Sequence, residues 1–137
     1  MTNPFHLAIP VSDLIKAAAF YEDVIGCKRG REGDKWIDFN LFGHQLVCHH
    51  VNQNNIDNSN SVDGDAVPVP HFGVVLNFGQ FDSLAQNLIA KKQAFLIKPK
   101  IRFAGKPGEQ RIMFLQDPSG NAIEFKAFKN LDSLFES

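Results

Sequence analysis

Three side chains in this sequence are suited to bind a metal ion. His6 and His71 each head a short apolar run, in FHLAIPV and HFGVVLNF, and Glu124 interrupts another apolar run near the end of the chain. A carboxylate among apolar residues must reach water or meet a cation. Two imidazoles and one carboxylate on one side of a metal form a facial triad, which suits Fe(II) or Mn(II), and Zn(II) or Ni(II) accepts the same ligands. We therefore predict that His6, His71 and Glu124 bind a divalent metal.

The three ligands can converge only if related strands of a repeated unit lie side by side. The pattern of apolar and turn residues predicts a β-α-β-β-β unit that occurs twice, and FHLAIPV aligns loosely with HFGVVLNF. In the first copy, a strand between Cys27 and Arg31 is weakly marked, and 28–35 has the composition of a charged turn. The other predicted elements are strand 5–11, a helix that follows Asp13 and ends at Gly26, strands 36–42, 45–51 and 71–78, helix 81–90, and strands 94–98, 111–116 and 121–128.

A single domain built of two such modules fits the length of the chain. With 137 residues, the chain is too short for two ordinary domains unless they are small repeats that share a core. The polar run that begins at Val51 has five asparagines and little to bury, which is typical of a linker or loop. We place module one at about 4–51, the linker at about 52–69, module two at about 70–128 and a C-terminal tail at 129–137.

Composition favours a small-molecule ligand over a polymer or a membrane. The formal net charge is -1 and no dense run of Lys or Arg occurs, which argues against nucleic acid or an anionic membrane surface as a partner. No apolar stretch approaches the roughly 20 residues that cross a bilayer. The two cysteines form no CxxC pair, and the N-terminus lacks the features of a secretion signal, so we expect a cytoplasmic protein.

A further histidine is a candidate for proton transfer. On the strand 45–51, the side chains of Gln45, Val47 and His49 share one face. In a gap-free alignment of the two copies, Val47 corresponds to Glu124. His49 follows Val47 by two residues and is the next side chain on the same face. His49 is therefore our candidate catalytic base, with the roles of metal ligand and cavity wall left open. We expect His44 and His50 to be structural.

Two other segments carry polar side chains that are suited to a substrate. Trp36, Asp38 and Asn40 alternate on one strand face, and Arg102 and Phe103 lead into the loop AGKPGEQ, whose glycines permit motion. Cations at this loop could meet an anionic group or could simply be solvated. The predicted substrate-binding residues are Trp36, Asp38, Asn40, Gln45, Arg102 and Phe103.

Two motifs at opposite ends of the chain resemble one known family. FHLAIPVSDLIKAAAFYEDVIG is similar to the opening strand and helix of the vicinal oxygen chelate superfamily, with its H-x-x-x-x-V-x-D-x-x-x-x-x-x-F-Y pattern. FLQDPSGNAIEF is similar to the closing D-P-x-G-N-x-x-E-F hairpin of the same superfamily, which includes glyoxalase I, extradiol dioxygenases, fosfomycin-resistance enzymes and bleomycin-binding proteins. WIDFNLFGHQLVCHH with IRFAGKPGEQ resembles a bacterial subgroup described as extradiol-type dioxygenases or glyoxalase-related proteins.

The resemblance implies an α+β fold in which two βαβββ modules form an incomplete barrel around a divalent metal. The metal positions of the family fall on His6, His71 and Glu124, with a fourth position between Val47 and His49. Members of this superfamily commonly form dimers, so the resemblance implies a homodimer.

Two departures from the family pattern bear on the reaction. Extradiol enzymes have a tyrosine near the metal, whereas the only tyrosine here, Tyr21, lies on the predicted first helix. Glyoxalase I generally has a Glu or Gln ligand in the last strand of module one, where this chain offers Gln45 and His49 out of register.

We expect a metal-dependent enzyme of the extradiol dioxygenase type that acts on a small molecule with neighbouring oxygens. The alternatives are a glyoxalase-like lyase or isomerase, and a non-catalytic protein that binds a small molecule and confers resistance. A domain whose histidines are only structural is a third alternative.

Overall fold

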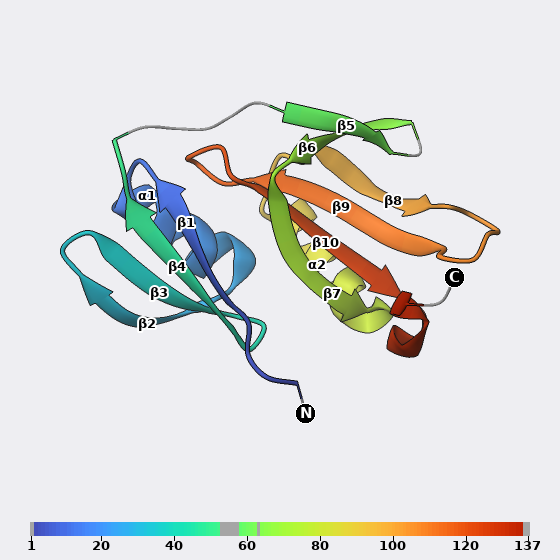
Figure 1. Cartoon of the computed structure of the whole chain (residues 1–137), viewed down its shortest axis with the longest axis horizontal. Helices are drawn as coiled ribbons and strands as arrows, with labels where there is room; N and C mark the ends of the chain where they lie inside the picture. Colours follow the sequence, from blue (N-terminus) through green and yellow to red (C-terminus); the bar gives the residue numbers. More distant parts are fainter. Residues whose placement is uncertain (1, 53–57, 63, 136–137) are drawn as a thin grey trace. The chain divides into compact units, whose positions relative to one another are not determined.

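The computed structural model describes residues 2–52, 58–62 and 64–135, which form two compact units (Figure 1). The first unit comprises Met1–Ile56 and Asp117–Asn121, and the second comprises Asp57–Gln116 and Ala122–Ser137. Among the helices that the structure describes, none is long and apolar enough to span a membrane.

The first unit is an open four-stranded sheet with one helical segment. The strand order is β1-β4-β3-β2, with β1 parallel to β4 and the other neighbours antiparallel. Its elements are β1 (His6–Val11), α1 (Leu14–Ala18), the π-helical η1 (Ala19–Ile25), β2 (Lys28–Gly33), β3 (Trp36–Leu41) and β4 (His44–His50).

Local sequence signals set the ends of the helical segment, as predicted. The Asp13 side chain caps α1 by accepting a 3.0 Å hydrogen bond from the Lys16 backbone N–H. Gly26 follows η1 with a φ of 93°, a conformation that glycine adopts without strain. The charged turn predicted at 28–35 is wrong in its first part, because β2 occupies Lys28–Gly33 as an edge strand. Most of its side chains are exposed, so its sequence shows no apolar alternation.

The second unit repeats this plan. Its main sheet has the order β7-β10-β9-β8, with β7 parallel to β10, and a separate two-stranded sheet is formed by β5 and β6. Its elements are β5 (Asn58–Val62), β6 (Asp65–Val69), β7 (His71–Asn77), α2 (Phe78–Ala90), β8 (Ile97–Arg102), β9 (Gln110–Gln116), β10 (Ala122–Phe128) and the 3-10 helix η2 (Leu131–Phe135).

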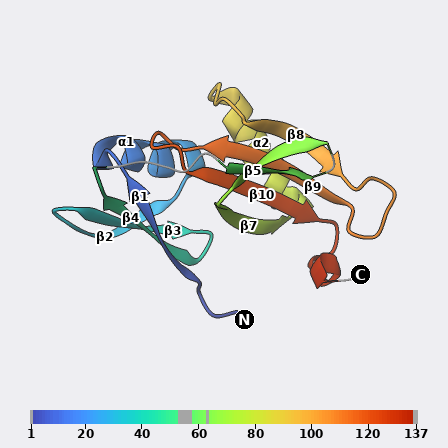
Figure 2. The same ribbon diagram turned by 45° about the horizontal axis from the view of Figure 1, so that its top comes forward.

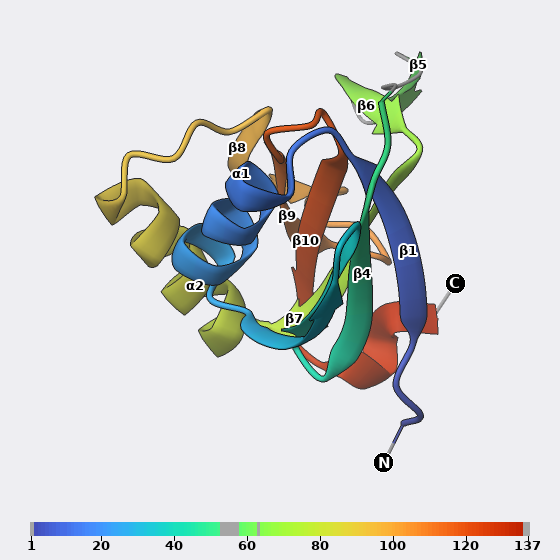
Figure 3. The ribbon, with the colours of Figure 1, turned by 90° about the vertical axis from the view of Figure 1, so that its left-hand side faces the viewer.

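Helix α2 covers one face of this sheet and leaves the other face for a site. Asn77 and Gln80 form a capping box at its start. On β9, Arg111 points to the helix side, where it forms an ion pair of 2.7 Å with Asp82. Figure 3 shows α2 along the sheet formed by β7 and β10. Because side chains alternate along a strand, Phe114 and Glu124 point to the opposite face.

Two predictions for this unit need correction. We predicted a linker at about 52–69, but its described part forms β5 and β6, next to β8 and β9 in Figure 2. Val67 is 4% exposed and packs on Ile112 and Phe114, so this polar stretch does bury an apolar side chain. The strand predicted at 94–98 lies at Ile97–Arg102 instead, which places Arg102 in a strand rather than in a loop.

The strand registers of the two units coincide. His6 is paired with Gln45 and Ala8 with Val47, while His71 is paired with Ala122 and Gly73 with Glu124. The predicted repeat of two βαβββ modules is therefore confirmed, although each sheet is open and does not close into a barrel. Val47 takes the place in the first unit that Glu124 has in the second.

Candidate metal and substrate site

The predicted site residues of the first unit share one face of its sheet. Residues paired in register on neighbouring strands point to the same side. Phe39 points to the helix side, where its ring centroid lies 5.6 Å from that of Tyr21. The opposite face carries the predicted residues of β1, β3 and β4, which are His6, Trp36, Asp38, Asn40, Gln45 and His49.

On this face, a chain of hydrogen bonds fixes the His6 ring. The Gln45 side chain donates from Nε2 to Asp38 Oδ2 at 3.1 Å, and its Oε1 lies 2.7 Å from His6 Nδ1. A carboxylate only accepts, so the amide nitrogen faces Asp38 and the amide oxygen faces His6. His6 Nδ1 must then donate. In the neutral ring, this leaves the lone pair on Nε2, where a metal can bind.

Asp38, which accepts the hydrogen bond from Gln45, is buried. It is 8% exposed, and Arg31 Nε lies 3.8 Å from its Oδ2. We predicted Asp38 and Gln45 as substrate-binding residues. In the structure, their side chains are engaged with each other and with His6, which is the arrangement of residues that orient a ligand histidine.

The His71 ring in the second unit is also held by a hydrogen bond from its Nδ1. Its Nδ1 lies 2.7 Å from the Pro68 carbonyl oxygen, which only accepts, so Nδ1 donates. Its Nε2 lies 3.2 Å from Glu124 Oε1, and this hydrogen bond raises the pKa of His71 above its ordinary value. The spacing also fits a metal, because two neighbouring ligands of an octahedral ion, each about 2.1 Å from it, lie about 3.0 Å apart.

Glu124 is a buried carboxylate with an incomplete set of partners. It is 5% exposed, and its Oε2 has no hydrogen-bond partner although Arg102 Nη1 lies 3.5 Å away. Lys126 Nζ lies 3.7 Å from its Oε1. Leaving a buried polar atom unpaired costs about 1–3 kcal/mol. Such an atom on a carboxylate is expected where a cation or a bound molecule completes the site.

Arg102 is also buried. Together with His71, Glu124, Lys126, Gln110 and Asp65 it forms what we call the second-unit cluster. Arg102 is 4% exposed, its Nη2 lies 3.1 Å from Asp65 Oδ2, and its guanidinium carbon lies 6.0 Å from the Phe114 ring centroid. Its Nε has no partner, and neither has Oε1 of Gln110, the residue paired with Arg102 across β8 and β9. Arg102, which we predicted to lead into the loop AGKPGEQ, therefore stands beside Glu124 at the end of β8.

The two units each contribute part of the predicted metal-binding set. His6 belongs to the first unit, and the pair His71 and Glu124 belongs to the second. In the chain as described, outside 53–57, 63 and the two ends, no three His, Cys, Asp or Glu side chains lie close enough together to hold a metal. Taken together, the two parts offer two imidazole Nε2 atoms and a carboxylate oxygen, which are atoms that divalent metals bind.

The remaining predicted residues have different surroundings. Asn40 accepts a 2.7 Å hydrogen bond from the Gly43 backbone N–H, so its side chain serves the turn between β3 and β4. His49 is exposed, and Trp36 is half-buried. Phe103 follows β8 with a φ of 57° and begins the loop.

Three residues of the second-unit cluster were absent from the predicted set. Lys126 could have been found, because it follows Glu124 by two residues and so shares its face. Gln110 stands just before a predicted strand, and nothing in its sequence context marks it. Asp65 lies in the polar run that we predicted as linker, so its ion pairs with Lys100 and Arg102 were beyond sequence reasoning.

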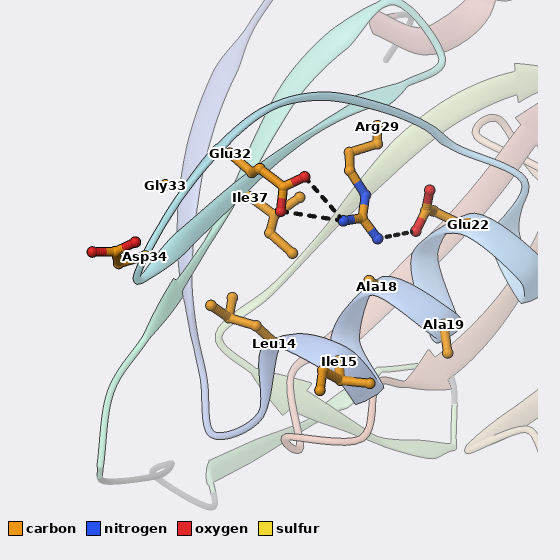
Figure 4. Close-up of a pocket in the computed structure, with 10 residues that line it drawn as sticks. All are labelled: Leu14, Ile15, Ala18, Ala19, Glu22, Arg29, Glu32, Gly33, Asp34 and Ile37. Carbon is orange, nitrogen blue, oxygen red and sulfur yellow. Dashed lines mark hydrogen bonds and ion pairs between the residues drawn. The ribbon is translucent and has the colours of Figure 1, made fainter.

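The hollow drawn in Figure 4 is separate from these residues. It has a volume of about 320 Å³, lies between the first-unit helical segment and β2 and β3, and is lined by none of the predicted site residues. Its one cation is already paired with two carboxylates of the lining, since Arg29 lies 2.6 Å from Glu22 and 3.4 Å from Glu32. It therefore gives no sign of metal or substrate binding.

Comparisons with known proteins agree with the fold. Residues 4–125 match the profile of the Glyoxalase/Bleomycin resistance protein/Dioxygenase superfamily. The chain is similar to the glyoxalase/bleomycin resistance protein/dioxygenase from Alicyclobacillus acidocaldarius, with 34% identity over 97% of this chain and 96% of that one and a TM-score of 0.81.

Two more distant structures share the fold alone. The fosfomycin resistance protein FosX from Listeria monocytogenes has a TM-score of 0.71 and 14% identity, over 98% of this chain and 99% of that one. Lactoylglutathione lyase from Agrobacterium tumefaciens has a TM-score of 0.64 and 18% identity, over 94% of this chain and 96% of that one. No match was found among curated proteins. As its opening and closing motifs predicted, the chain belongs to the glyoxalase/bleomycin resistance protein/dioxygenase superfamily.

Proposed function

We propose that this chain is a metal-dependent enzyme of the extradiol dioxygenase type, which acts on a small molecule with neighbouring oxygens. His6, His71 and Glu124 are the proposed protein ligands of one divalent metal, with Fe(II) or Mn(II) favoured over Zn(II) or Ni(II). One observation carries the proposal: both imidazoles donate from Nδ1 to an oxygen of the protein and so keep Nε2 for a metal. The two rings also head equivalent strands of the repeat.

The number of ligands favours oxygen chemistry over that of a lyase. Val47 occupies the register position of Glu124 and has no atom that binds a metal. Two histidines and one carboxylate leave open positions for both substrate oxygens and for O2. A lyase of the glyoxalase I type, by the resemblance described above, would have a Glu or Gln in the same strand as Val47.

The protein residues have separable tasks in this proposal. A bound divalent metal would polarise the neighbouring oxygens of the substrate as a Lewis acid. Gln45 and the Pro68 carbonyl hold the two rings, and Arg102 keeps a positive charge 3.5 Å from Glu124 Oε2. His49, two residues beyond Val47 on the same face, is the proposed base that takes a proton from the substrate.

Oxygen uptake tests the proposed reaction. The metal-free protein is loaded with Fe(II) without oxygen, mixed with a series of catechols and then exposed to O2, with His71→Ala as the control. Uptake that needs the catechol, the iron and His71 supports the proposal. If the chain binds zinc or nickel but takes up no oxygen, the lyase or isomerase alternative is favoured. If the chain binds no metal, the alternative of a non-catalytic binding or resistance protein is favoured.

We also propose that the chain works as a homodimer in the cytoplasm with a small-molecule substrate. The proposal follows from the resemblance and the composition. Light scattering at micromolar concentration is expected to give twice the mass of the 15.3 kDa chain. A monomer at that concentration contradicts the dimer and leaves the metal proposal untouched.

A further inference from the structure

We infer that the substrate of this site carries an anionic group next to its metal-binding oxygens, and that Lys126 meets this group. The inference rests on the proposed function, because it concerns the same site. Around Glu124, the cations Arg102, Lys126 and Lys100 outnumber the carboxylates Glu124 and Asp65 by three to two. The cluster thus has one positive charge in excess, and a divalent metal raises the excess to three.

Without a metal, the excess positive charge lies on exposed side chains. Arg102 and Glu124, which are 4% and 5% exposed, carry opposite charges that offset each other, whereas the Lys100 and Lys126 side chains are 38% and 32% exposed. A divalent metal bound by the buried Glu124 would add positive charge that is removed from water, and such charge is stable only when it is paired. Asp65 cannot provide further negative charge, because it already lies 3.0 Å from Lys100 Nζ and 3.1 Å from Arg102 Nη2. We therefore expect the bound molecule to supply the negative charge that balances the metal.

Lys126 is the cation that a metal would displace. Its Nζ lies 3.7 Å from Glu124 Oε1, the same oxygen that lies 3.2 Å from His71 Nε2. A metal held by that oxygen and that nitrogen repels an ammonium group from the oxygen. The Lys126 side chain is 32% exposed and shares the face of Glu124, so its ammonium group is free to turn to an anion beside the metal.

Two unpartnered buried atoms indicate the chemistry of the same molecule. Arg102 Nε is a donor without an acceptor, and Gln110 Oε1 is an acceptor without a donor, on residues paired across β8 and β9. An oxyanion supplies the missing acceptor, and a hydroxyl group supplies the missing donor. The substrate class is then a small hydroxylated carboxylate or phosphonate with neighbouring oxygens.

Calorimetry with a simple chelating anion tests this inference. Oxalate and oxamate have the same size, but oxamate carries one negative charge less. They are titrated into the Zn(II)-loaded native chain, Lys126→Gln and the control Lys98→Gln, which removes the same charge from an exposed position on β8. We expect Lys126→Gln to weaken oxalate binding about tenfold and oxamate binding less, while Lys98→Gln changes either by less than about twofold.

The Arg102 side chain provides a second readout. Its Nε–H signal in a ¹H–¹⁵N spectrum is expected to move when oxalate binds, because that group gains an acceptor. Equal oxalate affinities for Lys126→Gln and Lys98→Gln, or an unmoved Arg102 signal, would overturn the inference. Zinc binding is measured first for each chain. If the native chain binds no zinc, both the proposed function and this inference are wrong. If it binds zinc but Lys126→Gln and Lys98→Gln bind oxalate equally well, only the inference is wrong.

Discussion

The Tyr21 hydroxyl donates a 2.8 Å hydrogen bond to Asp117 Oδ2, between residues that are 96 positions apart in the sequence. Both side chains are buried, and Asp117 also accepts from the backbone N–H groups of Ser119 and Asn121. Burial raises the pKa of Tyr21 well above its ordinary value. The only tyrosine of the chain is therefore a structural link between its opening and closing motifs, and its hydroxyl is not placed to exchange protons with a substrate.

Replacing this tyrosine should lower stability without affecting the site. Tyr21→Phe removes a buried hydrogen bond to a carboxylate, and we expect the free energy of unfolding to fall by about 1.5–3 kcal/mol. Urea denaturation measures this change. Metal affinity should stay within about twofold, because Tyr21 packs on Phe39 at the helix side of the first sheet, whereas His6 lies on the opposite face. An unchanged denaturation midpoint would mean that the hydrogen bond contributes nothing.

Gly73 should tolerate no side chain. A Cβ at this position would overlap the backbone carbonyl of Glu124 on the neighbouring strand, so β7 and β10 would have to separate. We expect Gly73→Ala to cost about 1–3 kcal/mol of unfolding free energy. Gly79→Ala is the matched control, since its Cβ would meet only the Asn77 side chain at 3.4 Å in the first turn of α2. If both variants have equal stability, the close strand approach does not constrain this position.

Much of the fold was predictable because its signals are local. Asp13 and Gly26 mark the ends of the first helical segment, and the apolar runs after His6 and His71 mark two buried strands. The repeat then followed from the order of the elements. Strand β2 was only weakly marked between Cys27 and Arg31, because an exposed edge strand is held by backbone hydrogen bonds, which leave no apolar pattern in the sequence.

The site was less predictable because its partners come from distant segments. Strand alternation placed Asp38 with Trp36 and Asn40 on one strand and Gln45 with His49 on another, but the shared face of these strands and the hydrogen bonds from Asp38 to His6 depend on the register of three strands. Asp65 contacts Arg102 only because β6 packs beside β8 and β9. Such contacts depend on tertiary packing and have no signal within a single window of sequence.

The pair of His71 and Glu124 should make the metal-free protein sensitive to pH. The hydrogen bond raises the pKa of His71 in the folded chain, so the stability it contributes is fully present below the ordinary value of about 6.5 and is lost as pH rises through the folded value. Glu124→Gln should lower the pKa of His71. Titration of the His71 ring signals by NMR measures it, and the same pKa in both chains would show that Glu124 is not the cause.

The two cysteines should be unreactive in the folded chain. Burial raises the pKa of Cys27 and of Cys48 to about 12 each, so almost no thiolate exists at pH 8. A disulfide reagent that reports released thiolate should react slowly with the native protein. In guanidinium, both thiols should react within minutes. Rapid reaction of the native protein at pH 8 would mean that the helical side of the first sheet opens readily.

Metal content measured by elemental mass spectrometry tests the central proposal most directly. The native chain, His71→Ala, Glu124→Ala and the control His50→Ala are purified without chelator or histidine tag, and divalent metal is added back to a second sample of each. We expect about one iron or manganese per chain in the native protein and in His50→Ala, and little in the other two variants. A native chain without metal even after the addition, or equal metal in all four chains, would contradict the assignment of His71 and Glu124 as ligands.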